Sequence, residues 1–130
     1  MKLLLDTHIF LWATSDTARL APAEQAALAA PENTVVVSAA TVWEIAIKRA
    51  LGRMDFPLEE LDAILARAGF ELLPIGAGHA IAAGGLPRHH GDPFDRMLIA
   101  QARLEDLTLV SEDAAFAAYD VRLFGREVAR

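Results

Sequence analysis

The sequence predicts an α/β fold, in which a mostly parallel sheet of five strands is covered by helices on both faces. Strand and helix signals alternate along the chain with short connections, the pattern of parallel sheets whose strands are joined by crossover helices. The runs Leu3–Leu5 and Thr34–Ser38 are almost continuously apolar or β-branched, as expected of strands buried on both faces. A chain of 130 residues fits one domain, residues 1–130, with one core.

Helices are expected on either side of the second strand. The segment Ala21–Ala30 is rich in alanine, has a proline in its first turn and ends before a second proline. Three consecutive valines favour a strand at Thr34–Ser38. The next helix is expected at Thr41–Leu51, and it ends before Gly52, because glycine is common directly after a helix.

The second half of the chain continues this alternation. Apolar residues at helical spacing between Pro57 and Gly69 predict a helix, and Phe70–Ile75 predicts a third strand. Glycines and a proline exclude regular structure from the loop 84–91. The remaining expected elements are a short helix at His79–Ala83, a helix from Asp92-Pro93 to about Leu104, a fourth strand at Leu107–Val110 and a fifth at Tyr119–Phe124.

Composition limits the cellular setting. The chain has no cysteine and no export signal at its start, and no apolar run approaches the roughly 18 residues needed to span a bilayer. We therefore expect a cytoplasmic protein without a membrane partner. The net charge of −6 argues against a nucleic-acid partner. That argument fails if the acids gather in one pocket, because bound divalent cations reverse the local sign.

Four acidic residues occupy equivalent places in the predicted fold. Asp6 follows the first strand, Glu44 lies early in the helix after the second strand, Asp95 lies in the first turn of a helix, and Asp113 follows the fourth strand. Such positions face one edge of a parallel sheet, so the four side chains are expected to converge. Crowded carboxylates without histidine or cysteine partners suit Mg²⁺ or Mn²⁺.

Each acid also has a purely structural interpretation. Asp6 and Asp113 suit turns or helix caps, and a cap is the better interpretation of Asp92, which precedes a proline. Glu44 fits a capping box and also a helical ion pair with the lysine four residues later. Four separate caps are each plausible, but their common position at one edge favours a shared functional site.

Four motifs carry a resemblance to a known family. They are Leu4-Leu5-Asp6-Thr7-His8, Ser38-Ala39-Ala40-Thr41-Val42-Trp43-Glu44-Ile45, His89-His90-Gly91-Asp92-Pro93-Phe94-Asp95-Arg96-Met97-Leu98-Ile99-Ala100-Gln101-Ala102 and Leu109-Val110-Ser111-Glu112-Asp113. In this order they resemble the motifs of PIN-domain ribonucleases, in particular VapC-like toxins of bacterial toxin–antitoxin pairs. The resemblance implies a three-layer α/β/α sandwich, metal-dependent cleavage of RNA, a homodimer and inhibition by a small VapB-like antitoxin.

The resemblance also assigns roles to individual residues. The acids that it implies as metal-binding and catalytic residues are Asp6, Glu44, Asp95 and Asp113, with Thr7, Ser111 and Asp92 as supporting residues. Two points of register stay open. Glu112 competes with Asp113 for the last acidic position, and Asp92 lies one helical turn from Asp95. The spacing of Ser111 and Asp113 matches the motif better, which favours Asp113.

The expected chemistry follows from the acids. One or two Mg²⁺ or Mn²⁺ ions would activate a water for in-line attack on the scissile phosphate and stabilise the leaving oxygen. Asp113 is the preferred group to orient that water or take its proton. Basic side chains are expected to contact the RNA backbone. These residues are Lys48, Arg49, Arg53, Arg88 and Arg96, joined by His89 and His90 in the loop before the third motif. Trp12 and Trp43 lie in apolar helical stretches, where core packing is more usual than base stacking.

Other functional classes remain as alternatives. A haloacid-dehalogenase-like phosphatase usually has a second aspartate two positions after the first, where this chain has His8. A receiver domain normally requires a late lysine, and no lysine follows Lys48. A non-catalytic PIN-like binding module typically lacks one or more of the acids, and all four are present. The apolar early helix, Ile9 to Trp12, could form an antitoxin groove or simply pack in the core.

Overall fold

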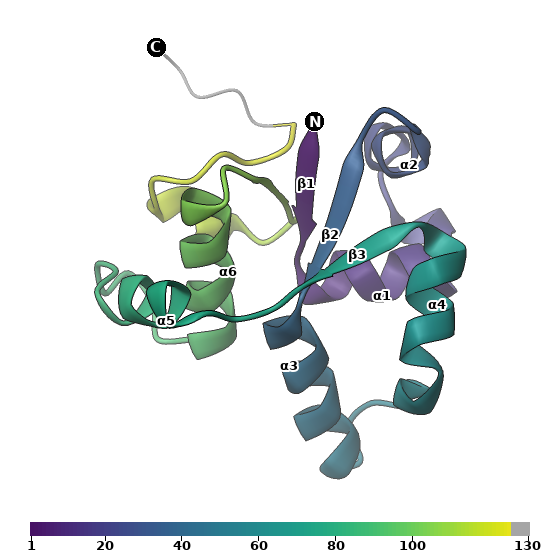
Figure 1. Ribbon diagram of the computed structural model, residues 1–130, viewed down its shortest axis with the longest axis horizontal. Helices are drawn as coiled ribbons and strands as arrows, with labels where there is room; N and C mark the ends of the chain where they lie inside the picture. The colour runs from purple at the N-terminus through teal and green to yellow at the C-terminus, as the bar shows by residue number, and fades with distance from the viewer. Residues whose placement is uncertain (126–130) are drawn as a thin grey trace.

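The computed structural model describes residues 1–125 and is built around one parallel sheet of four strands (Figure 1). The strands are β1 (Lys2–Leu5), β2 (Thr34–Ser38), β3 (Phe70–Leu73) and β4 (Thr108–Val110). Their order is β3-β2-β1-β4, and every neighbouring pair is parallel. All four strands therefore end at the same edge of the sheet, with β1 in a central position. The α/β class and the parallel sheet are confirmed.

The fifth strand is where the sequence prediction was wrong. The segment Tyr119–Phe124 forms only one isolated parallel bridge, between Leu109 and Leu123. The Leu109 backbone N–H donates to Arg122 at 2.8 Å, and its carbonyl accepts from Phe124 at 2.9 Å. Since β4 has only three residues and pairs with β1 along one side, its other side offers little backbone to a fifth strand. The chain then turns at Gly125, which has a φ of 75°.

Six α-helices connect the strands, with short 3₁₀ turns at 17–19, 58–60 and 114–118. The helices are α1 (Thr7–Ser15), α2 (Pro22–Ala29), α3 (Ala39–Ala50), α4 (Leu61–Ala68), α5 (Ala77–Gly84) and α6 (Pro93–Leu104). The third of these begins two residues before the predicted start at Thr41, because Ser38 caps it by accepting a hydrogen bond from the Ala40 N–H at 2.9 Å. Within residues 1–125 no helix has both the length and the apolar character needed to cross a bilayer.

Apolar side chains of the sheet divide between two core clusters. Leu3 and Leu5 of β1 pack with residues of α1, α3 and α4, whereas Leu4 packs with residues of α6. All three leucines are fully buried, and each contributes about 1.5–3 kcal/mol of hydrophobic stabilisation. The prediction that the first strand is buried on both faces is confirmed. Its central place fixes the position of Asp6 directly beyond its end.

Candidate active site

Asp6 is held at the meeting point of β1, β4 and α1. Its backbone N–H donates to the Val110 carbonyl at 3.1 Å. One side-chain oxygen caps α1 by accepting from the Ile9 N–H at 2.9 Å, and the other accepts from the Ser111 hydroxyl. Burial raises the pKa of the Asp6 carboxyl above its ordinary value, although these two hydrogen bonds act in the opposite direction. The cap interpretation is correct, and it leaves the carboxylate buried at the sheet edge.

Glu44 projects from α3 towards α1 and is buried. One carboxylate oxygen accepts from the Thr7 hydroxyl at 2.6 Å, and the other pairs with the Lys48 ammonium at 2.7 Å. The predicted ion pair is therefore present. The capping box is absent, because α3 starts at Ala39 and Ser38 provides its cap. A carboxylate that bridges two helices and keeps a basic partner is fixed in orientation, as a metal ligand needs to be.

Asp92 and Asp95 lie at the start of α6. The carboxylate of Asp92 accepts from the N–H groups of Phe94 at 2.9 Å and Asp95 at 3.1 Å, so its predicted role as a cap is confirmed. Burial raises the pKa of Asp95 to about 6, from an ordinary value of 3.8. The charge of Asp92 is the next largest cause, and those of Asp113 and Glu44 also raise it, while His90 lowers it.

Asp113 is exposed and caps the 3₁₀ turn at 114–118. Its side chain accepts from the Ala115 N–H at 2.9 Å, and its own N–H donates to the Ser111 hydroxyl at 3.0 Å. The charge of Asp113 raises the pKa of both Asp6 and Asp95. Glu112 instead raises the pKa of a different carboxyl, that of Glu24. These contacts support Asp113 over Glu112 as the last acid of the site, although the assignment of ligands stays a prediction.

Glu24 is an acid that the sequence analysis did not single out. It is buried in the first turn of α2, where it accepts from the Ala21 N–H at 2.8 Å. Burial raises its pKa above the ordinary value, the bond from Ala21 lowers it, and Glu112 and Asp6 raise it further. A glutamate two residues after Pro22 is the sequence signal for this position, because it can reach back to the free N–H before the helix.

A buried polar link joins the two helices that carry Glu44 and Asp95. Gln101 of α6 is fully buried, and its side-chain oxygen accepts from the Ser38 hydroxyl at 2.5 Å. Its amide donates to the Pro74 carbonyl at 3.2 Å. The N-cap of α3, the segment after β3 and the middle of α6 are thereby tied together. The sequence gives no signal for this link, because its members lie far apart along the chain.

The predicted RNA-binding residues of the third motif are engaged with the protein itself. The guanidinium of Arg96 donates to the carbonyls of Ala83 at 3.1 Å, Leu86 at 2.9 Å, Pro87 at 3.0 Å and His90 at 3.4 Å. Three of these carbonyls lie in the loop between α5 and α6 and the fourth lies in α5, so Arg96 fixes the loop against both helices. Contact of Arg96 with RNA stays a prediction, and it requires some of these bonds to be exchanged for phosphate.

The other predicted RNA contacts differ in availability. The ammonium of Lys48 is paired with Glu44, and Arg49 is paired with Glu59 at 2.8 Å. His89 packs edge-on against Tyr119, with 4.9 Å between ring centroids, and His90 also meets that ring. Arg53 and Arg88 are exposed. Their contacts with RNA stay predictions.

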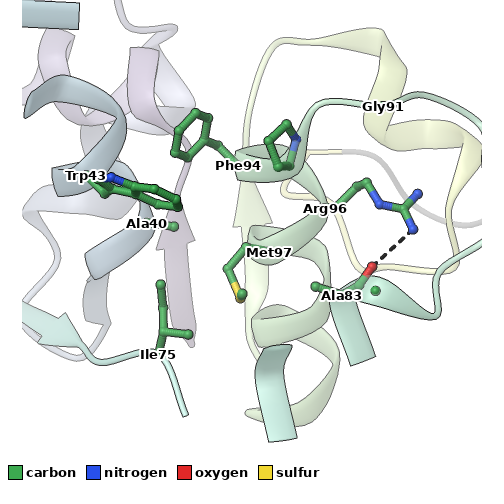
Figure 2. A pocket seen from close by; sticks show the side chains of 10 residues that line it. Ala40, Trp43, Ile75, Ala83, Gly91, Phe94, Arg96 and Met97 are labelled. Atoms are coloured by element: carbon green, nitrogen blue, oxygen red, sulfur yellow. Dashed lines mark hydrogen bonds between the residues drawn. The ribbon is translucent and has the colours of Figure 1, made fainter. Parts of the chain in front are cut away.

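An apolar groove lies between α3 and α6, the helices that carry Glu44 and Asp95 (Figure 2). Its volume is about 280 Å³, and Trp43 and Phe94 meet edge-to-face in its wall, with 5.2 Å between ring centroids. Trp43 is 58% exposed, so the expectation that it belongs to the core was wrong. Arg96 and Ala83 also line the groove, and the Arg96 guanidinium donates to the Ala83 carbonyl (Figure 2). Trp12 packs partly buried against the core, as expected.

The acids fit a hard divalent cation by their chemistry. Their ligand atoms are all carboxylate oxygens. Burial and the charge of Asp113 raise the pKa of both Asp6 and Asp95, an effect that a bound cation would relieve. Among residues 1–125, however, no three histidine, aspartate or glutamate side chains form a ready-made ligand group. Ser111, Thr7 and Lys48 hold the carboxylates of Asp6 and Glu44 instead.

Comparison with known proteins places this arrangement in a family. The model of the PIN domain matches residues 3–122 of the chain. The chain belongs to the PIN domain family. This assignment confirms the resemblance that the four motifs indicated. A search of curated proteins gives no significant match.

Solved structures share the fold of this PIN domain. A chain of VapBC2 from Rickettsia felis, crystallised with a promoter DNA fragment, has a TM-score of 0.69 at 20% identity, covering 95% of this chain and 96% of that one. A toxin–antitoxin complex from Klebsiella pneumoniae gives 0.63 at 22%, with coverage of 97% and 99%. VapBC-5 from Mycobacterium tuberculosis gives 0.59 at 21%, with coverage of 94% and 98%. At such identities the likeness establishes the fold.

Proposed function

We propose that this PIN domain is a metal-dependent ribonuclease that hydrolyses phosphodiester bonds within RNA, and that it is the toxin of a toxin–antitoxin pair. The observation that carries the proposal is the raised pKa of Asp95, about 6, caused by burial and by neighbouring carboxylates. Family membership supports the nuclease chemistry. Groups that raise one another's proton affinity in this way are typical of functional sites.

The four acids are the proposed metal ligands, and neighbouring groups orient them. Asp6, Glu44, Asp95 and Asp113 hold Mg²⁺ or Mn²⁺, which supplies Lewis-acid stabilisation of charge and a water of lowered pKa when bound. Ser111 and the Ile9 N–H orient Asp6, and Thr7 orients Glu44. Lys48 offsets one negative charge at Glu44.

The proposed reaction is an in-line displacement at phosphorus. Asp113 is exposed and takes the proton of the attacking water, whose oxygen forms the new bond to phosphorus. The bond to the leaving sugar oxygen breaks, and that oxygen is protonated from solvent. Arg53 and Arg88, both exposed, contact neighbouring phosphates and position the RNA.

The proposed partners are a VapB-like antitoxin and a second copy of the chain. Structures with this fold come from toxin–antitoxin complexes of several bacteria, which supports an antitoxin. Ile9 and Phe10 of the early helix are fully buried, so they are core residues rather than the antitoxin groove. The second copy is proposed from the resemblance to VapC-like toxins alone. Sedimentation of the isolated chain tests the homodimer.

RNA cleavage by charge-neutralised variants tests the proposed function. Wild type, Asp6→Asn and Asp95→Asn are incubated with a mixed RNA pool in Mg²⁺, in Mn²⁺ and in EDTA. Asparagine weakens metal binding at both positions, and at position 6 its side-chain oxygen can still accept from the Ile9 N–H that caps α1. Loss of one ligand is expected to reduce the cleavage rate by at least about 100-fold. Asp62→Asn, on the exposed first turn of α4, is the matched control and should cleave as wild type does.

Two results would contradict the proposal. Cleavage that persists in EDTA, or in both site variants, would show that the acids do not form the active site. RNA binding without cleavage in either metal would instead favour the non-catalytic binding module.

A further inference from the structure

His90 is anchored beside the site by two groups. It lies in the loop between α5 and α6, whose carbonyls are held by the guanidinium of Arg96. From the other side, the phenol oxygen of Tyr119 accepts a hydrogen bond from the His90 backbone N–H at 3.2 Å. Tyr119 is itself buried, with only 6% of its surface exposed. The main chain and ring of His90 are therefore fixed relative to the start of α6.

The contacts of Tyr119 favour one of the two tautomers of the His90 ring. A phenol has a single O–H proton to donate. Two acceptors lie near it: the Nδ1 atom of His90 at 2.7 Å and the His90 carbonyl at 3.5 Å. The shorter contact takes the proton, so Nδ1 accepts. A neutral imidazole that accepts at Nδ1 carries its own proton on Nε2.

The Nε2 atom of His90 faces Asp95. It lies 3.4 Å from one carboxylate oxygen of Asp95, without the alignment of a hydrogen bond. Among the described residues it is the one buried side-chain polar atom without a hydrogen-bond partner. His79 provides the contrast, because its two ring nitrogens contact the Gly76 N–H at 2.9 Å and Glu105 at 2.8 Å.

A buried N–H without a partner is unfavourable, and a small rotation of the Asp95 carboxylate supplies the missing acceptor. We propose that His90 is a positioning residue, whose Nε2–H, fixed by Tyr119, holds one oxygen of Asp95 and leaves the other for the divalent cation. This inference rests on the proposed function, since it takes Asp95 as a metal ligand. It assigns roles to His90 and Tyr119 that differ from the predicted contact of His90 with RNA.

The tautomer is measured on the metal-free protein, independently of any activity. Long-range ¹H–¹⁵N NMR at a pH where the ring is neutral should place the His90 proton on Nε2. In Tyr119→Phe the Nδ1 acceptor loses its donor, so the spectrum should show a mixture of tautomers. A wild-type proton on Nδ1 would overturn the proposal, whatever the protein does with metal or RNA.

Metal affinity tests the effect on Asp95. Titration calorimetry with Mn²⁺ compares wild type with His90→Leu, His90→Gln and the exposed control Asp62→Asn, after circular dichroism has shown that each is folded. Loss of a hydrogen bond to a metal ligand typically weakens binding about 10–100-fold, which is the effect expected for His90→Leu. His90→Gln keeps an N–H donor and should recover most of the affinity, while Asp62→Asn should bind as wild type does.

Each further outcome has a defined meaning. Equal Mn²⁺ affinity in wild type and His90→Leu would overturn the proposal. So would a folded His90→Gln that binds as weakly as His90→Leu, because the donor would then be irrelevant. A wild-type protein that binds Mn²⁺ but cleaves no RNA would overturn the proposed reaction, while the affinity series would still decide the role of His90.

Discussion

Replacing Asp95 by asparagine should stabilise the metal-free protein at neutral pH while removing its activity. The pKa of Asp95 is raised from 3.8 to about 6, so its ionised form is destabilised in the folded state. A shift of this size corresponds to at most about 3 kcal/mol. The side chain is 21% exposed, and solvent screening reduces the effect. The substitution also removes the favourable interaction of the Asp95 charge with the dipole of α6, which costs about 0.3–1 kcal/mol. The net gain in the free energy of unfolding is about 1–2 kcal/mol.

The sign of the pH dependence follows from linkage. Because the folded pKa lies above the unfolded one, the folded state binds more protons between these values, and stability falls as pH rises from about 3.8 through 6. The advantage of Asp95→Asn should be complete at pH 7 and nearly absent at pH 4. At pH 7 a gain of 1–2 kcal/mol corresponds to an increase in Tm of about 4–8 °C.

Thermal and urea unfolding in EDTA at the two pH values measure this effect. Asp62→Asn is the matched control, since it removes a carboxylate from the first turn of an exposed helix and should give no gain. A Tm for Asp95→Asn at or below that of wild type at pH 7 would refute the reasoning. A gain as large at pH 4 as at pH 7 would refute it too, because the benefit would not come from removing a charge.

The remaining predictions concern polar links around the site. Gln101→Leu should lower the free energy of unfolding in urea by about 2–3 kcal/mol, because the Ser38 hydroxyl and Pro74 carbonyl lose buried partners; a change below that range would show that water replaces them. Arg96→Met should increase hydrogen exchange in the loop 84–91, where it removes three bonds to carbonyls, and unchanged exchange would show that the loop is held by other contacts. Thr7→Val should reduce Mn²⁺ affinity about 10-fold by freeing Glu44, and Mn²⁺ affinity equal to that of wild type would contradict this.

Local patterns predicted most of the fold. The leucine run before Asp6 and the valine run before Ser38 are continuous enough to identify central strands and their carboxyl ends. The acids follow those strands or begin helices, so their edge could be inferred without coordinates. Tyr119–Phe124 failed as a strand because pairing depends on the length of its neighbour, which its own sequence does not contain.

The arrangement of partners around the acids was less accessible. The positive charge of Arg96 predicts contact with phosphate. Only the fold shows that carbonyls of the loop between α5 and α6 surround its guanidinium. Trp43 has apolar neighbours along its helix, yet its exposure depends on which face of α3 meets the sheet. Gln101 and Glu24 are polar residues whose burial follows from long-range packing. Sequence reasoning therefore identified the groups that carry charge better than the groups that hold them.

The order of the strands also sets when the site can be completed during synthesis. β1 is made first, yet one of its two neighbours in the sheet is β4, the last strand to emerge. Asp6 receives its hydrogen bond from Ser111, 105 residues later. An elongating chain that ends before β4 keeps Asp6 but has neither its hydroxyl partner nor Asp113. Long-range pairing of this kind forms late. The proposed nuclease activity should therefore appear only when nearly the whole domain has left the ribosome.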